Sequence, residues 1–401
     1  MNDLLGFCQS ERDWLLDTIE ALVRIESPTQ DKPAVDRCGT EIARRLTRVG
    51  GRVQVLPRER AGDHLLAEFG CGRSQILLLG HFDTVWPVGQ LARMPLERRA
   101  GKLFGPGVFD MKAGIGIGLL AVRALHETGA APRHRVVLLL TSDEETGSAT
   151  SRGAIEEEAR RSDAVLVLEP ALPGGGVKTS RKGCGQFSLV ISGIPAHAGI
   201  DPGRGASAIH ELAHQILAVR NLQDSSSGVS VNVGLVGGGS RPNVVAGEAR
   251  AEIDVRVPTM DDARRIEAAL RTLAPRDPRV TLSIQGGIER PPLERSEAVV
   301  RLYEMAREIA ATYGRELAEG GSGGGSDGNF TAALGVATLD GLGAIGDGAH
   351  AADEHVEVAD LPWRASLVAD LIGRLGALGS PGASNRRRAE GGDAGSGGAA
   401  R

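Results

Sequence analysis

The stretch Ile76-Leu-Leu-Leu-Gly-His-Phe-Asp-Thr-Val85 decides the fold. Its unbroken apolar run up to Gly80 is typical of a strand buried on both faces, as in parallel sheets. His81 and Asp83 follow at the carboxyl end of this strand, the edge where open α/β sheets bind ligands. Because they are two residues apart, they point the same way, so Asp83 could fix the His81 tautomer while the other nitrogen binds a metal. A strand-end histidine beside a capping aspartate explains this stretch alone equally well.

Two further apolar segments end in the same manner. Val136–Leu140 runs into Asp143-Glu144-Glu145, and Ala164–Leu168 runs into Glu169. Parallel strands place their carboxyl ends side by side, so we expect these acids to share one site with His81.

Asp110 belongs with this set through its position in the chain. It follows the turn-rich Gly105-Pro-Gly and precedes an expected buried helix over Met111–His126. A carboxylate at a helix N-terminus is commonly a cap, and capping is the stronger interpretation of Asp110 when it is considered alone.

The remaining chain predicts two domains, as a length of 401 residues also does. Alternating strands and two helices, about 206–221 and 261–273, replace the buried-strand pattern after Cys184. We therefore expect an α/β fold with a mostly parallel sheet flanked by helices, interrupted by a smaller α+β domain. The expected boundaries are 1–183, 184–288 and 289–379, followed by a disordered Gly- and Ala-rich tail over 380–401.

Composition excludes several classes of protein. The net charge of −5 gives no reason to expect nucleic acid or an anionic membrane as partner. The chain start lacks the pattern of a signal peptide, and no apolar run reaches the ~18 residues of a membrane span. The four cysteines are Cys8, Cys38, Cys71 and Cys184. They are scattered without metal-type spacing, which predicts free thiols and a cytoplasmic location.

The collected histidine and carboxylate groups favour a metal site. Imidazole and carboxylate ligands suit zinc, cobalt or manganese. Four carboxylates close together need cations, and two divalent ions would balance their charge. Neighbouring Glu144 and Glu145 cannot present the same face, so one should bind metal while the other takes a proton from water. The collected residues are His81, Asp110, Glu144, Glu145, Glu169 and His350.

A second candidate site competes with this one. His210-Glu-Leu-Ala-His214 fits the helical zinc motif H-E-x-x-H. However, Leu217 stands where the extended motif needs Gly, and no third histidine follows at its spacing. An apolar stripe runs beside both histidines, so we favour an ordinary polar helix face.

The Gly-rich segment Gly320–Asn329 also has two interpretations. Its composition resembles a flexible linker. Its place directly before an apolar segment, and its Ser-Asp-Gly-Asn end, favour a binding loop made largely of backbone groups.

Four motifs follow one another along the chain: His81-Phe-Asp83-Thr-Val85, Gly105-Pro-Gly-x-x-Asp110-x-Lys112, Asp143-Glu144-Glu145-x-Gly147 and Glu169-Pro170. In this order they resemble the dizinc exopeptidases, which include glutamate carboxypeptidase, acetylornithine deacetylase and succinyl-diaminopimelate desuccinylase. The resemblance covers about 10–380, and Gly287-x-x-Arg290-Pro-Pro is similar to the glutamate carboxypeptidase branch in particular.

The resemblance implies a role for each residue of the site. Asp110 would bridge two metals, one also held by His81 and Glu169, the other by Glu145 and His350. Glu144 would be the general base, and Asp83 would orient His81. His197, in Ala-His-Ala-Gly, resembles a lid histidine that polarises the scissile carbonyl, often across a dimer. The positions that match substrate contacts are Asn243, Arg256, Arg290, Ser326 and Asn329.

The resemblance further implies an enzyme that cleaves an amide bond next to a free carboxylate, releasing a C-terminal glutamate or similar residue. An N-acyl amino acid deacylase is the alternative, and an inactive metal-binding scaffold is another. The implied assembly is a homodimer formed through residues 184–288. Alternatives remain open for three assignments. His197 could be an ordinary loop histidine, and Arg256 could be a salt-bridge partner within its strand. His355 could be the metal ligand in place of His350.

Overall fold

The structure, a computed structural model, describes residues 3–72, 74–130 and 134–377, and the tail expected over 380–401 lies outside them. The chain divides into two compact units, each with its own apolar core. The first unit contains residues up to Val177, Ala298–Ala318, and the chain from Leu334. The second contains Lys178–Glu297 and Glu319–Ala333.

A six-stranded sheet forms the centre of the first unit, in the order β1-β2-β6-β3-β7-β14. Strands β3, β6, β7 and β14 are parallel, while β1 and β2 are antiparallel to their neighbours. All residues of β3 are buried, because helices cover both faces of the sheet. The bounds are β1 Arg52–Leu56, β2 His64–Phe69, β3 Gln75–His81, β6 Arg135–Thr141, β7 Ala164–Val167 and β14 Thr338–Leu339.

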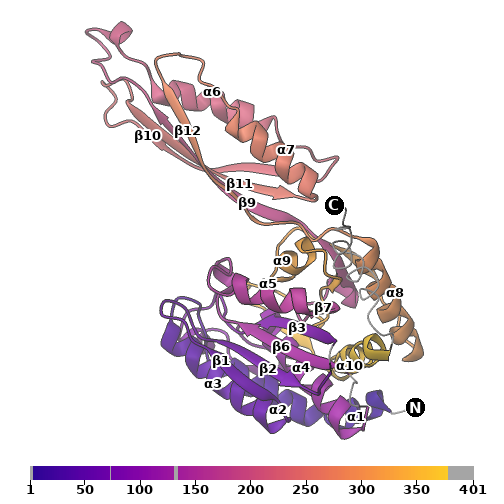
Figure 1. The fold of residues 1–401 in the computed structure, drawn as a ribbon. Coiled ribbons are helices and arrows are strands. Elements are labelled where there is room, and N and C mark those ends of the chain that lie inside the picture. Colours follow the sequence, from indigo (N-terminus) through magenta and orange to yellow (C-terminus); the bar gives the residue numbers. More distant parts are fainter. Residues whose placement is uncertain (1–2, 73, 131–133, 378–401) are drawn as a thin grey trace, which may run out of the picture. The chain divides into compact units, whose positions relative to one another are not determined.

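Helices α2 and α3 lie on one face of this sheet and α5 lies on the other (Figure 1). Helix α4 packs against α10, α2 and α1, and its residues are almost all buried. Each fully buried Leu or Ile side chain in this layer stabilises the unit by about 1.5–3 kcal/mol. The bounds are α1 Leu4–Ser10, α2 Arg12–Val23, α3 Lys32–Arg48, α4 Ala113–Glu127, α5 Arg152–Arg161, α8 Glu297–Thr312 and α10 Leu361–Ala377.

Short elements complete the first unit beyond the carboxyl ends of its strands. A small sheet has the order β15-β16-β5-β4, and four short helical turns carry loop residues. The bounds are β4 Glu97–Arg99, β5 Lys102–Phe104, β15 Gly346–Asp347, β16 His355–Glu357, η1 Gln90–Ala92, η2 Val108–Lys112, η3 Glu144–Thr146 and η4 Pro173–Gly175.

The second unit is an antiparallel four-stranded sheet, β10-β11-β9-β12, with α6 and α7 packed on it. Its core residues alternate along β9 and β11, which is the period-two pattern of a sheet covered on one face. A two-stranded sheet, β8 and β13, and the short α9 and η5 complete it. The bounds are β8 Val177–Arg181, β9 Gly183–Ser192, α6 Ala208–Arg220, β10 Ser230–Gly238, β11 Glu248–Val257, α7 Met260–Arg271, β12 Thr281–Arg290, β13 Glu319–Ser322, α9 Gly328–Ala333 and η5 Pro202–Arg204.

The limits of the second unit differ from the boundaries expected from the sequence. A boundary at 288 would cut β12, which pairs with β9 as far as Arg290 opposite Cys184. Residues Glu319–Ala333, which include the Gly-rich segment Gly320–Asn329, group with the second unit rather than the first. It is a packed loop and not a linker, because Arg181 donates to the carbonyls of Gly324 and Gly325.

All four cysteines are free, as the sequence indicated. Among the described residues, no helix combines the length and the apolar character that crossing a membrane requires.

Candidate metal centre

Residues from five separate segments of the first unit meet beyond the strand ends. They form two groups, His81 with Asp110 and Glu169, and Asp110 with Glu145 and His350. Within each group, one candidate ligand atom per residue lies within 4.8 Å of the others, and Asp110 belongs to both. The sheet explains the meeting, since His81 pairs in register with Thr141 at the ends of parallel β3 and β6.

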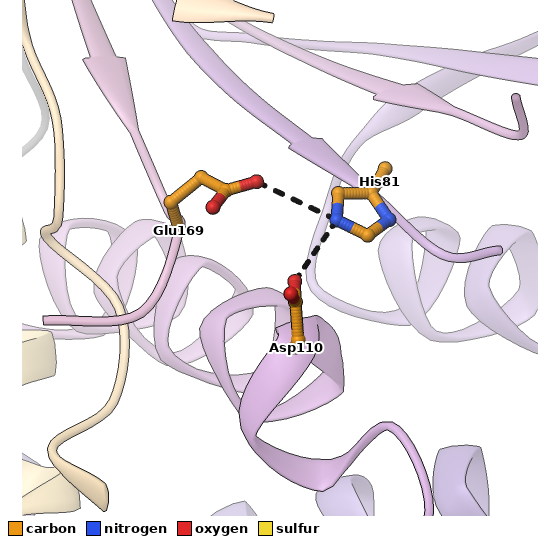
Figure 2. A group of neighbouring side chains, drawn as sticks. All are labelled: His81, Asp110 and Glu169. Carbon is orange, nitrogen blue, oxygen red and sulfur yellow. Dashed lines mark hydrogen bonds and ion pairs between the residues drawn. The ribbon is translucent and has the colours of Figure 1, made fainter. Parts of the chain in front are cut away.

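The first group is centred on the His81 ring (Figure 2). Its Nε2 lies 3.2 Å from Asp110 Oδ1 and 3.5 Å from Glu169 Oε1. Its Nδ1 faces the Asp83 backbone carbonyl at 3.0 Å and the Asp83 carboxylate at 3.4 Å. Burial would lower the pKa of His81, but hydrogen bonds to these carboxylates raise it well above its usual value. With Nδ1–H donating to Asp83, neutral His81 has Nε2 left to bind a cation.

The second group surrounds His350, which has a left-handed backbone with φ 61°. His350 Nε2 lies 3.4 Å from Asp110 Oδ2 and 3.3 Å from Glu145 Oε2. Hydrogen bonds to Asp110 and Glu145 raise the pKa of His350 to about 10. Burial raises the pKa of Glu145.

The donor set fits metal ions. Glu145 Oε1 is buried and has no hydrogen-bond partner among the described residues. A buried carboxylate oxygen without a partner is costly unless a cation approaches it. The nitrogen and oxygen ligands of the two groups would hold two divalent ions, one in each group, and Asp110 belongs to both.

Asp83 makes three hydrogen bonds that the sequence did not indicate. Its fully buried carboxylate accepts the backbone N–H of Glu144 at 3.3 Å and of Glu145 at 3.2 Å, and the Thr29 hydroxyl at 2.7 Å. Asp83 therefore holds the turn η3 as well as contacting His81. Within the described part of the chain, Glu145 joins a ligand group and Glu144 joins neither.

Asp110 is not a helix cap. The N-cap of α4 is Lys112, and no side chain caps this helix end. A Cβ on Gly114 would lie 2.0 Å from the Leu168 carbonyl oxygen, so only glycine lets the start of α4 approach the end of β7. This approach brings Asp110 near Glu169. The capping interpretation of Asp110 is wrong because its carboxylate contacts His81 and His350 instead.

Comparison with known proteins agrees with this geometry. Residues 77–374 match the peptidase family M20/M25/M40. The chain belongs to this family. Over 393 residues it is 30% identical to carboxypeptidase G2 of Pseudomonas sp. strain RS-16, covering 94% of this chain and 92% of that protein. It is also 30% identical over 356 residues to succinyl-diaminopimelate desuccinylase of Xanthomonas oryzae pv. oryzae, covering 84% and 93%.

Solved structures share the fold of this chain. The YXEP protein of Bacillus subtilis, a dinuclear metal-binding peptidase of family M20, has a TM-score of 0.68 at 16% identity, covering 92% of this chain and 99% of that one. The family and the α/β fold class predicted from the sequence are therefore confirmed, and the chain is a metallopeptidase-type hydrolase.

A buried polar network supports the turn that carries Glu144 and Glu145, and sequence reasoning missed it. The Ser142 backbone N–H donates to His64 Nδ1 at 3.2 Å, so neutral His64 carries its proton on Nε2. His64 Nε2 lies 3.1 Å from Thr150 Oγ1, which in turn donates to Asp143 Oδ2 at 2.7 Å. These bonds anchor both ends of the turn that carries Glu144.

In the second unit, His197 has a defined tautomer. Its Nδ1 accepts the backbone N–H of Gly199 at 3.1 Å and of Ile200 at 3.2 Å. A neutral ring that accepts at Nδ1 carries its proton on Nε2, so it offers a donor there. The neighbouring Ala198 N–H donates to the Asn243 carbonyl at 3.0 Å, which places the His197 and Asn243 loops together.

The other predicted substrate contacts already have partners in this unit. Arg256 makes two 2.9 Å hydrogen bonds to Asp254 of its own strand. Arg290 is buried, donates to Asp327 at 2.9 Å and stacks over Phe330. The Asn329 amide accepts from Ser326 N–H and donates to the carbonyls of Lys182 and Pro291.

His210, His214 and His355 lie outside both ligand groups. His210 and His214 are exposed on α6, whereas the intervening Glu211 is buried and accepts backbone N–H groups of Arg276 and Asp277. His355 packs on Phe104 and lies 2.9 Å from Lys102 Nζ.

Proposed function

We propose that this chain cleaves an amide bond next to a free carboxylate, releasing a C-terminal glutamate or a similar amino acid. The observation that carries the proposal is the pair of ligand groups sharing Asp110, with Glu144 beside ligand Glu145. The acids Asp110, Glu145, Glu169 and Glu144 bring four negative charges, which two divalent ions would balance. We propose zinc, with cobalt or manganese as alternatives, because the ligands are imidazole and carboxylate.

Within this proposal the residues divide the chemistry. The ions, when bound, lower the pKa of a water molecule and polarise the amide carbonyl. Glu144 accepts a proton from the attacking water and delivers it to the leaving nitrogen. Asp83 keeps Glu144 and Glu145 in place through their backbone N–H groups. His197 would donate its Nε2 proton to the oxygen that gains charge.

Arg256 is the proposed partner for the substrate carboxylate, with Asn243 as a neutral donor. Arg256 is about a third exposed and is held by Asp254, so its guanidinium is pre-oriented. Arg290, Ser326 and Asn329 are more buried and already paired within the unit. We propose that these three residues shape the Gly-rich loop Gly320–Asn329.

A homodimer formed through residues 184–288 is part of the proposal. Strand β10 is an edge of its sheet, and it exposes Leu235 and Val236 at 69% and 63%. Exposed apolar edge strands commonly pair with another chain. Sedimentation should give a dimer, and Leu235→Lys should shift it toward monomer. A cytoplasmic location stays a prediction.

The test combines metal analysis with a substrate panel. Fully loaded protein should contain two divalent ions, and the panel should include peptidyl-glutamates, N-acetyl and N-succinyl amino acids, and their carboxyl-amidated forms. The highest kcat/KM for peptidyl-glutamates would support the carboxypeptidase. The highest value for N-acylated amino acids would favour the deacylase, which the similarity to a desuccinylase supports as second candidate. No hydrolysis of any substrate by loaded protein would contradict both.

Arg256→Ala tests the carboxylate contact. Loss of a charge-assisted pair should lower kcat/KM for the acidic substrate, because the activation free energy rises by roughly 2–5 kcal/mol. Amidation of the substrate carboxylate should then cost the variant far less than it costs the native enzyme. Equal penalties in both proteins would show that Arg256 does not meet this carboxylate.

A further inference from the structure

Glu354 lies buried in the first unit, four residues after His350, and has no role in the chemistry described above. Its side-chain oxygens accept four N–H groups. Oε2 accepts from Gly107 N–H and from the Trp86 indole, both at 2.8 Å. Oε1 accepts from Phe109 N–H at 2.9 Å and from Asp110 N–H at 3.0 Å. Three of these four donors belong to the backbone that carries the shared ligand Asp110.

The backbone at Asp110 needs such an acceptor. Asp110 has φ −114° and ψ 94°, so regular helical hydrogen bonds do not hold it. Gly107, three residues earlier, has a left-handed φ of 70° that favours glycine. Without Glu354, the N–H groups of Gly107, Phe109 and Asp110 would lose the acceptor that holds this irregular segment.

Glu354 also connects the two parts of the second ligand group. The Glu354 N–H donates to the Ala351 carbonyl at 3.1 Å, which closes a turn directly after His350. One short turn therefore supplies the ligand His350 directly, and holds the ligand Asp110 through its backbone. Glu354 thus links the chain that carries His350 to the backbone that carries Asp110.

We propose that Glu354 is the positioning residue of the metal centre, fixing Asp110 between the two ligand groups. This inference rests on the proposed metal site. It requires a carboxylate at this position, because four N–H donors occupy both oxygens. A glutamine offers one acceptor oxygen and an NH₂ group, which would face N–H donors.

The experiment compares Glu354→Gln with Glu211→Gln. Glu211 is the matched control, since its buried carboxylate also accepts backbone N–H groups but in the second unit. Zinc affinity of the metal-free proteins is measured by equilibrium dialysis, together with Tm with and without zinc. Glu354→Gln should weaken zinc binding by about 10–100-fold, the usual scale for residues that orient metal ligands. Its kcat should fall with little change in KM. Glu211→Gln should have a lower Tm than the native protein but the same zinc affinity.

Three outcomes would overturn the inference: native zinc affinity in Glu354→Gln, an equal loss in Glu211→Gln, or a rise in KM alone. If Glu354→Gln does not fold, Trp86→Phe removes one donor and leaves the carboxylate. It should weaken zinc binding less but in the same direction, and an unchanged affinity would again overturn the inference. Native protein that binds no zinc would instead contradict the proposed metal site itself.

Discussion

The strand edge of the first unit and helix α6 of the second unit both bring histidine and glutamate together, yet only one forms ligand groups. At the strand edge, residues far apart in sequence converge on Asp110, and the buried Glu145 Oε1 has no hydrogen-bond partner among the described residues. On α6, His210 and His214 are exposed, and Glu211 is occupied by backbone N–H groups. The difference teaches that a local spacing is weaker support for a metal site than convergence imposed by a sheet.

Asp110→Ala should break the strand-edge site most severely. It removes the one carboxylate shared by both ligand groups. We expect loss of bound metal and a fall in kcat larger than the ~10²–10⁴-fold typical of an acid–base group. Elemental analysis and activity should fall together. Two ions retained in this variant would contradict the shared-ligand assignment.

Glu144→Gln should separate chemistry from metal binding. Glutamine keeps the shape of the side chain but cannot take a proton from water. We expect kcat to fall by ~10²–10⁴-fold while both metals stay bound. Glu145→Gln is the matched neighbour and should lose metal. The reverse result would mean that the roles of the two glutamates are exchanged.

Thr150→Val should have an intermediate effect through the network of His64, Thr150 and Asp143. Valine keeps the volume but removes the hydroxyl between His64 and Asp143. We expect unfolding free energy to fall by about 1–3 kcal/mol, the cost of unsatisfied buried groups. Because the turn carries Glu144, kcat should fall while KM changes little. Thr150→Ser keeps the hydroxyl and should restore kcat, so equal losses in both variants would argue against this network.

The double variant His210→Gln and His214→Gln should have the smallest effect. Both side chains are exposed, and surface substitutions usually change stability by no more than about 0.5 kcal/mol. Metal content and kcat should stay within about twofold of native. A folded variant that has lost its metal would support the zinc-helix interpretation of α6.

The sequence predicted the sheet and its edge because buried parallel strands leave a plain signal, an apolar run ending in acids. The convergence of His81, Asp110, Glu145, Glu169 and His350 followed from that edge and from the family resemblance. Strand β12 was missed because the expected domain boundary at 288 falls within it, whereas the strand continues through Gly286-Gly287 to Arg290. The short β4, β5, β15 and β16 were missed because two or three residues carry no periodicity.

The supporting residues were harder to predict for a physical reason. Glu354, His64 and Asp83 act on backbone N–H groups and hydroxyls, and every residue except proline has such an N–H. A sequence shows which side chain is present, but not which distant backbone group it meets. The buried Arg364 is a similar case, since it donates to the carbonyls of Gly343 and Gly175 beside the Glu169 loop.

The division of the first unit into separated segments sets an order of events during synthesis. Translation delivers His81, Asp110, Glu145 and Glu169 before the second unit is made, but His350 and Glu354 only after it. At about 5–20 residues per second, roughly ten to forty seconds pass between Glu169 and His350. During that time the ribosome-bound chain does not yet include the ligand His350, the positioning residue Glu354, β14 or α10. Nascent chains halted before Leu334 should therefore bind zinc weakly, and full metal loading should require His350 and Glu354 to have been made.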